Sequence, residues 1–254
     1  MPTSPPNGPS SSLPRLHAIV PVRSLGDGKA RLGLALDAEE RAAIVVGLLR
    51  RTLEVVAQVP AIAAVNVVSA DPMLLALARL LGATAVREEP LASRAPETAA
   101  ADSLNAALRQ GRAAAQSAGA TSLLYLPADL PLLSVAALER LLDAADAALT
   151  AGAGRPIVVI APSDARGGTN ALLLAPLAVV EPCFGAASLA AHLRAAADSG
   201  ATVQLVADPE IGFDLDTPED LERLDPARLV ELEEMGAATL DELAADALAT
   251  AEVG

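Results

Sequence analysis

Short runs of apolar residues alternate along this chain with longer stretches in which apolar residues recur at helical spacing. We predict buried strands at residues 16–22, 63–69, 83–86, 121–126, 156–161, 170–174 and 202–206. We predict helices at residues 37–59, after Asp71-Pro72, at residues 98–118, from Ser134 to 149, at residues 187–198 and after Thr217-Pro218. This alternation predicts a single α/β domain with a mainly parallel central sheet and helices on both faces.

Local signals support several of these boundaries. Asp37 precedes its helix as an N-cap, with Glu40 placed to complete a capping box. Asp71-Pro72 is typical of a helix start with proline in the first turn. The two strands on either side of Gly167-Gly168 suggest a local hairpin or a reversed strand.

The ends of the chain differ from the middle. We predict a disordered, Pro/Ser-rich tail at residues 1–14 and a single α/β domain at residues 15–224. Residues 225–254 form an acidic, helix-prone extension, interpreted as an appended helix pair or as a surface for a partner. No apolar run approaches the roughly 18–20 residues that span a bilayer, and no signal peptide is evident. With only one cysteine, Cys183, the chain has no internal disulfide, and we expect a cytoplasmic protein.

Charge narrows the classes of function. The net charge of −14 argues against a general nucleic-acid binder, which needs basic side chains to neutralise phosphates. Lys29 is the only lysine, and all other Lys/Arg positions are arginines. A lysine kept in such a chain suggests a place where a compact ammonium group is needed instead of a guanidinium.

The loop after the first predicted strand could bind phosphate. It contains Gly26 and Gly28, which allow close approach of the backbone, and the cations Arg23, Lys29 and Arg31. Its spacing matches neither a Walker A loop nor the dinucleotide fingerprint. The alternative is a solvated glycine loop with surface cations.

Three aspartates are candidate ligands for Mg²⁺. Asp129 follows a strand and lies between Pro127 and Pro131, which restrict the backbone and fix where the carboxylate points. Asp214 and Asp216 are two residues apart, so in extended backbone they face the same side. Three converging carboxylates could hold Mg²⁺ against phosphate oxygens. Alternatively, Asp129 occupies an ordinary turn, and Asp216 or Thr217 only caps the next helix.

Two Gly-containing segments carry hydroxyl groups. Thr169 follows Gly167-Gly168, and Ser188 follows Gly185, in arrangements that could bind a small phosphate or carboxylate. His192, one helical turn after Ser188, could face the same site. The alternatives are an ordinary turn and an ordinary N-cap.

Motifs of covalent hydrolases and zinc proteases are absent from the sequence. Nucleotidyl transfer needs neither, because a phosphate monoester is already an anionic nucleophile at neutral pH. Cations, carboxylates and glycine loops are the groups that this reaction requires.

Together these segments resemble the 2-phospho-L-lactate guanylyltransferase family, which activates a phosphorylated acid in the biosynthesis of the deazaflavin coenzyme F-420. The matching stretches are Ile19-Val-Pro-Val-Arg23, Lys29-Ala-Arg-Leu32, Leu126-Pro-Ala-Asp-Leu-Pro131, Gly167-Gly-Thr-Asn170, Phe184-Gly185 with Ser188 and His192, and Asp214-Leu-Asp-Thr-Pro-Glu-Asp-Leu221. They cover residues 16–224. The sequence departs from the family in having Arg23 in place of a usual Lys, and Ser103-Leu104-Asn105 in place of Gly-Leu-Asn.

The resemblance implies a Rossmann-like fold of the glycosyltransferase-A type, with GTP as co-substrate and Mg²⁺ as cofactor. It implies that Thr169, Gly185 and Ser188 hold the phospho-acid, and that Lys29 and Arg31 serve the triphosphate. Asp129, Asp214 and Asp216 would then serve the metal, with Lys29, Arg31 and Asp129 as catalytic residues, and Arg23 and Asn105 would contact the nucleotide.

The resemblance leaves three acids open as acceptors: phosphoenolpyruvate, 2-phospho-L-lactate and 3-phospho-D-glycerate. Small differences between such substrates give only about 1–3 kcal/mol of discrimination, so the motifs do not distinguish the three acids. We favour phosphoenolpyruvate among them. A molybdopterin or sugar-phosphate nucleotidyltransferase of the same fold is one alternative. A non-catalytic nucleotide-binding interaction protein is another. We expect no nucleic-acid or membrane partner, and we keep open a homodimer and a hand-off of product to the next enzyme of the pathway.

Overall fold

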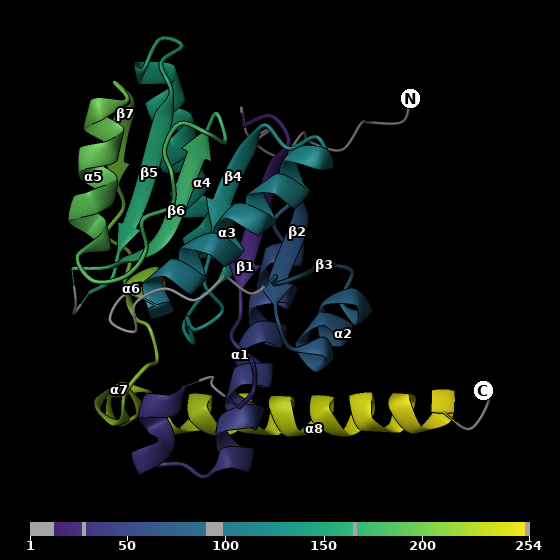
Figure 1. Cartoon of the computed structure of the whole chain (residues 1–254). Coiled ribbons are helices and arrows are strands. Elements are labelled where there is room, and N and C mark those ends of the chain that lie inside the picture. The colour runs from purple at the N-terminus through teal and green to yellow at the C-terminus, as the bar shows by residue number, and fades with distance from the viewer. Residues whose placement is uncertain (1–12, 27–28, 90–98, 165–166, 252–254) are drawn as a thin grey trace, which may run out of the picture.

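A seven-stranded sheet runs through the centre of the molecule in the order β3-β2-β1-β4-β6-β5-β7 (Figure 1). The structure is a computed structural model and describes residues 13–26, 29–89, 99–164 and 167–251. The strands are β1 Leu16–Pro21, β2 Ile62–Ser69, β3 Thr84–Arg87, β4 Ser122–Tyr125, β5 Ile157–Pro162, β6 Thr169–Ala175 and β7 Thr202–Leu205. The helices are the 3₁₀ turn η1 Ala30–Leu34 and α1 Ala38–Ala57, α2 Pro72–Leu80, α3 Ala99–Ser117, α4 Val135–Ala151, α5 Ser188–Asp198, α6 Pro209–Gly212, α7 Pro218–Arg223 and α8 Pro226–Ala251.

The sheet is parallel except at β6. Strands β1, β2, β3 and β4 pair in parallel, as do β5 and β7, whereas β6 runs antiparallel to both β4 and β5. The reversed strand predicted beside Gly167-Gly168 is therefore confirmed, and so is the mainly parallel sheet. The short helix α6 and the turn η1 were not predicted, because neither is long enough to show a helical repeat of apolar residues.

Helices cover both faces of the sheet (Figure 1). Alternate residues of β1 divide between the faces: Ala18 and Val20 pack toward α1, α2 and α4, and Ile19 packs toward α3 and α5. The core is almost wholly aliphatic, as the composition requires, with Tyr125 as its one fully buried aromatic residue among those described.

The predicted helix starts are confirmed. The Asp37 carboxylate accepts from the backbone N–H groups of residues 39 and 40, and the Glu40 carboxylate in turn accepts from the Asp37 N–H. Asp71 caps α2, and Ser134 caps α4 through the N–H of Ala137. These caps satisfy N–H groups that have no partner within a helix, and they so determine where each helix begins.

One edge of the sheet collects the polar residues that follow strands. Arg23 comes after β1, Glu88 directly after β3, and Asp129 after β4. Because β6 is reversed, its first residue, Thr169, lies at the same edge. Ligands of open α/β sheets bind at this edge, where the strand order changes direction.

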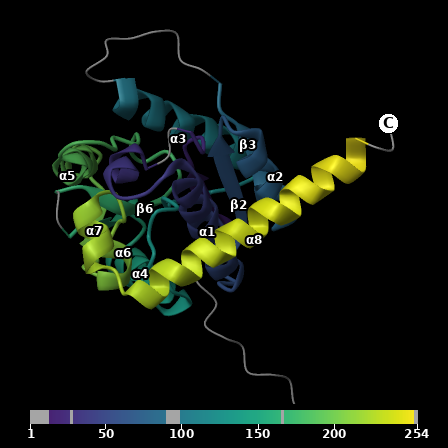
Figure 2. The same cartoon turned by 90° about the horizontal axis from the view of Figure 1, so that it is seen from below.

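The C-terminal extension is one continuous helix, α8, and not a helix pair. Figure 2 shows α8 lying across α1 and extending beyond it. The crossing is close because glycines meet backbone: a Cβ atom on Gly47 would lie 2.1 Å from the Leu232 carbonyl oxygen, and one on Gly236 would lie 1.8 Å from that of Ala43. Leu232 is fully buried beside Ile44 and Leu48 of α1.

The two ends of the chain relate differently to the described residues. Residues 1–12 of the predicted N-terminal tail lie outside them, and Leu13 is already buried in the core. Gly28 of the predicted phosphate loop also lies outside the described residues. No helix in the described ranges is long and apolar enough to cross a membrane.

The crossing of α1 and α8 generates a stability prediction. We expect Gly236→Val to lower the free energy of unfolding by about 2 kcal/mol or more, because the added atoms meet a carbonyl oxygen that cannot move without shifting α1. The matched control is Ala237→Val, on an exposed position of the same helix. Urea denaturation measures both, and equal losses in the two variants would contradict the close crossing.

Candidate active site

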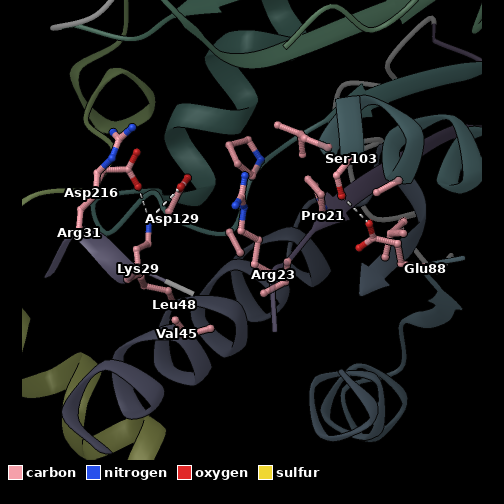
Figure 3. Close-up of a pocket in the computed structure, with 16 residues that line it drawn as sticks. Pro21, Arg23, Lys29, Arg31, Val45, Leu48, Glu88, Ser103, Asp129 and Asp216 are labelled. Carbon is pink, nitrogen blue, oxygen red and sulfur yellow. Dashed lines mark hydrogen bonds and ion pairs between the residues drawn. The ribbon is translucent and has the colours of Figure 1, made fainter. Parts of the chain in front are cut away.

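A cavity of about 430 Å³ opens at the carboxyl edge of the sheet, between the segments that follow β1 and β4 (Figure 3). Its described lining comes from segments that are far apart in the sequence. These are the end of β1, the turn η1, the middle of α1, the ends of β2 and β3, the start of α3, and the segments around Asp129 and Asp216. The cavity thus lies where the fold predicts a ligand.

Lys29 lies at one end of this cavity between two carboxylates (Figure 3). Its Nζ is 2.9 Å from Asp129 Oδ2 and 2.7 Å from Asp216 Oδ1, and only 9% of its side chain is exposed. The two acids are more accessible, at 29% and 34%. The meeting of the lone ammonium group with Asp129 and Asp216, predicted from the sequence, is therefore present.

Local backbone structure brings these three residues together. Lys29 adopts a left-handed conformation, with φ 54° and ψ 35°, at the start of η1, and the fully buried Leu32 anchors that turn. The Leu215 N–H donates to the Asp129 carbonyl oxygen at 3.0 Å, which holds the two acidic segments side by side. Thr217 forms the capping box of α7, so Asp216 is not needed as the cap.

Burial and mutual charge shift the pKa values of this cluster. Burial raises the pKa of Asp129, as do the charges of Asp216 and Asp214, while Lys29 acts in the opposite direction. Burial lowers the pKa of Lys29, but the two carboxylates outweigh this and the net pKa is raised. Lys29 is therefore a permanent cation at the end of the cavity.

Asp214 does not join the ion pairs of Lys29. Its Oδ1 accepts from Ser163 Oγ at 2.9 Å, and Asn170 Nδ2 lies 3.5 Å away. The extended backbone places two alternate residues on one side, but it does not set the direction of each side chain, and the Ser163 hydroxyl draws Asp214 toward β5 and β6. In the described ranges, no three His, Cys, Asp or Glu side chains converge as a ready-made metal site.

Two further cations predicted for the nucleotide also line the cavity. Arg31, in η1, lies at the same end as Lys29, and Arg23, which is exposed, lies between that end and the opposite one (Figure 3). Together with Lys29 they supply three cations beside the carboxylates of Asp129 and Asp216, and cations of this kind can bind a polyphosphate.

Thr169, Gly185 and Ser188 lie together, although they are not part of the cavity lining in the described residues. The Leu189 N–H donates to the Gly167 carbonyl oxygen, which joins the turn before β6 to the start of α5. Gly185 has φ 125°, a conformation that favours glycine, and a Cβ atom there would lie 3.0 Å from Cβ of Ala101. Thr169 and Ser188 are both buried.

His192 is fully buried against these residues. Its Nε2 accepts the Cys183 N–H at 2.9 Å, and its Nδ1 lies 3.0 Å from Thr169 Oγ1. Burial lowers the pKa of His192 to about 4, so the ring is neutral at neutral pH. With Nε2 used as an acceptor, the proton must reside on Nδ1 and point at the Thr169 oxygen.

Asn105 was predicted to contact the nucleotide, but its described contacts are to backbone. Its Nδ2 donates to the carbonyl oxygens of Ala101 and Phe184, and its Oδ1 accepts the Phe184 N–H at 2.8 Å. Both ends of the amide are thus used within the protein. Asn105 joins α3, which lines the cavity, to the segment that contains Gly185.

Sequence reasoning did not identify Glu88, and it noted Ser103 only as a departure from the family pattern. Both residues line the cavity at the end away from Lys29 (Figure 3). The Ser103 hydroxyl donates to Glu88 Oε1 at 3.0 Å. Glu88 follows the short strand β3, a position that could have been found by the same rule that identified Asp129.

Solved structures with the same fold include several nucleotidyltransferases. A protein from Desulfovibrio desulfuricans G20, assigned to the nucleotide-diphospho-sugar transferases, has a TM-score of 0.62 at 14% identity, covering 89% of this chain and 97% of that one. A 4-diphosphocytidyl-2C-methyl-D-erythritol synthase has a TM-score of 0.54 at 15% identity, covering 85% and 97%. At such identities the likeness shows the Rossmann-like nucleotidyltransferase fold.

Sequence similarity is more specific. The profile of the family described as "Guanylyl transferase CofC like" matches residues 16–225. The phosphoenolpyruvate guanylyltransferase of Rubrobacter xylanophilus is 44% identical over 210 residues, covering 83% of this chain and 93% of the relative. The protein of that name from Sphaerobacter thermophilus is 36% identical, covering 82% and 91%. The chain therefore belongs to the CofC-like guanylyltransferase family.

Proposed function

We propose that this chain transfers GMP from GTP to phosphoenolpyruvate and releases diphosphate, as a step in the biosynthesis of coenzyme F-420. The observation that carries the proposal is the buried Lys29, held between Asp129 and Asp216 at one end of a cavity that Arg23 and Arg31 also line. The names of the relatives support the choice of phosphoenolpyruvate over 2-phospho-L-lactate and 3-phospho-D-glycerate.

The reaction is a single displacement at phosphorus. A phosphate oxygen of the acid attacks the α-phosphorus of GTP and forms a new P–O bond. The bond from that phosphorus to the oxygen bridging to the β-phosphate breaks, and diphosphate leaves with the electron pair. No general base is required, because the attacking phosphate is already ionised. Lys29, Arg23 and Arg31 bind the triphosphate and offset the charge that develops on its oxygens.

Asp129 and Asp216 would hold a Mg²⁺ ion that enters together with the triphosphate. Mg²⁺ in phosphoryl-transfer sites is held by one or two carboxylates, with phosphate and water oxygens completing the shell. When bound, the ion neutralises phosphate charge and polarises the α-phosphorus. Asp214 would act at longer range, since its charge contributes to raising the pKa of Asp129.

Thr169, Gly185 and Ser188 would hold the acid. The Nδ1–H of His192 donates a hydrogen bond to Thr169 Oγ1. The hydroxyl group of Thr169 can therefore use its own hydrogen to donate to an anionic ligand. Ser163 joins this group to Asp214, because its N–H donates to the Gly168 carbonyl oxygen and its hydroxyl donates to Asp214 Oδ1. The cytoplasmic location, the homodimer, the hand-off of product and the independent role of residues 225–254 stay predictions.

The activity can be tested by measuring diphosphate release. We expect release with GTP only when a phospho-acid is present, and we expect phosphoenolpyruvate to be the best acceptor. GTP, ATP, CTP and UTP should each be paired with the three candidate acids, a sugar 1-phosphate and molybdopterin. Turnover with the sugar phosphate or molybdopterin instead, or no turnover with any acid, would overturn the proposal.

We expect Asp129→Asn and Lys29→Met each to lower kcat/KM by about 100-fold or more. Lys29→Met removes the cation that offsets phosphate charge, whereas Asp129→Asn removes a carboxylate that positions Lys29 and that would hold Mg²⁺. The matched control is Asp143→Asn, at an exposed position of α4, which should retain wild-type activity. Circular dichroism checks the fold of each variant. Asp129→Asn is the decisive one, since it preserves shape, and unchanged kinetics in it would contradict the assignment.

The acid site generates a separate prediction. Ser188→Ala should raise KM for phosphoenolpyruvate by about tenfold, the effect of one hydrogen bond to a charged group, and leave KM for GTP unchanged. Ser199→Ala, at the other end of α5, is the control. Steady-state kinetics with each substrate varied in turn separates the two constants, and a rise confined to GTP would place the acid elsewhere.

His192 predicts a pH dependence of stability. Its pKa is about 4 in the folded chain and 6.5 as its ordinary value. Between these pH values His192 binds a proton in the unfolded state but not in the folded state. The free energy of unfolding therefore falls as pH is lowered from 6.5 toward 4, by about 3 kcal/mol in total. Urea denaturation from pH 7.5 to 4.5 should show this part of the slope in the wild type and not in His192→Asn. Identical slopes would show that His192 titrates normally.

A further inference from the structure

The end of the cavity opposite Lys29 has a different chemistry. Figure 3 shows Pro21, Ser103 and Glu88 gathered there, with Arg23 between them and the Lys29 cluster. Apolar side chains of the lining, Val68 from β2 and Leu104 and Ala107 from α3, complete this end. Apolar surface suits the flat faces of an aromatic base, whereas the charged end, with Lys29, Arg31 and two carboxylates, suits phosphates and a metal ion.

Glu88 is the charged group at this apolar end, and its position is fixed. Its backbone N–H donates to the Ser69 carbonyl oxygen at 2.9 Å, which continues the pairing of β3 with β2. Ser103 Oγ donates to Glu88 Oε1 at 3.0 Å and sets the orientation of the carboxylate. In the described part of the chain, no Lys or Arg side chain forms an ion pair with Glu88, so its charge is not neutralised by a neighbouring cation there.

A carboxylate accepts hydrogen bonds and donates none. Among the common nucleobases, guanine alone presents two adjacent donors on its pairing edge, the N1–H and the 2-amino group. Adenine presents an acceptor, N1, at the corresponding position, which a carboxylate repels. Two oxygens of one carboxylate can therefore accept both guanine donors, while one of them also accepts from Ser103.

From this geometry we infer that Glu88, oriented by Ser103, reads the guanine base of GTP through N1–H and the 2-amino group. Glu88 is thus the residue that determines the nucleotide specificity of this chain. The inference rests on the proposed function, because it takes the Lys29 end of the cavity as the triphosphate end. It adds to that function a physical basis for the choice of GTP, which neither the cations nor the acidic cluster supplies, since all nucleoside triphosphates share the same phosphates.

The test exchanges one acceptor for a donor. In Glu88→Gln, the amide oxygen still accepts from N1–H, but the amide nitrogen faces the 2-amino group of guanine with a donor. Xanthine keeps N1–H and has a carbonyl at position 2, so it matches the glutamine. Inosine lacks any group at that position and reports the contribution of the 2-amino group alone.

Binding of GTP, ITP and XTP to the full chain should be measured by isothermal titration calorimetry without acid. We expect the wild type to bind GTP at least tenfold more tightly than ITP or XTP, the range for one hydrogen bond to a charged group. In Glu88→Gln, the ratio of XTP to GTP affinity should rise by about 100-fold or more. Glu89→Gln, the adjacent exposed acid outside the cavity lining, is the matched control and should bind like the wild type.

Ser103→Ala tests the orienting bond. It leaves the carboxylate in place but frees its rotation, so the preference for GTP over ITP should narrow severalfold while binding of the triphosphate is retained. Unchanged GTP preference in Glu88→Gln would overturn the inference. An equal weakening of all three nucleotides would overturn it as well, because Glu88 would then shape the cavity without reading the base.

These outcomes are separable from failure of the proposed function. Diphosphate release by the wild type with GTP and phosphoenolpyruvate, together with unaltered nucleotide preference in Glu88→Gln, would contradict only the role of Glu88. Selective, Glu88-dependent binding of GTP without diphosphate release from any acid would support the role of Glu88 and contradict the proposed transfer.

Discussion

The ion pairs of Lys29 are the interaction on which the rest of the site depends. The Lys29 side chain is only 9% exposed, and its ammonium group contacts the carboxylates of Asp129 and Asp216, which lie 100 and 187 residues away in sequence. Burial of a charge is unfavourable unless the charge is paired, so each partner requires the others. The cluster therefore joins η1, the segment after β4 and the segment before α7 into one wall of the cavity.

The two ends of the cavity divide the work of recognition. In the proposed complex, the cations at one end would contact the phosphates that all nucleoside triphosphates share and would contribute affinity without discrimination. The apolar walls and the Glu88 carboxylate at the other end would face the base, which is the part of the ligand that varies. Helix α3 links this division to the acid, because Ser103 and Leu104 line the cavity while Asn105 holds the Phe184 backbone just before Gly185.

The sequence predicted the fold and the meeting of Lys29 with Asp129 and Asp216 for identifiable reasons. Strand–helix alternation and the caps at Asp37, Asp71 and Ser134 are local signals, and the structure confirms them. Asp129 could be found because it directly follows a strand between two prolines, and Lys29 because it is the only lysine of the chain and lies in the glycine-containing loop after the first strand. Asp214 was misplaced relative to Lys29 because backbone alternation does not reveal the Ser163 hydroxyl, which comes from a strand 51 residues earlier. The contacts of Asn105 could not be predicted for a similar reason, because its backbone partner at Phe184 is distant in sequence. Its contact with the nucleotide stays a prediction.

Helix α8 begins at Pro226, directly after residues 16–225, which the family profile matches. Yet Leu232 of α8 fills the same apolar cluster as Leu48 of α1, and Leu48 also lines the cavity. The segment that the family profile matches therefore ends before a helix that packs against α1. A chain shortened to that segment would leave the outer side of α1 uncovered and loosen the wall behind the nucleotide, whereas an addition after residue 254 would leave the glycine crossing intact.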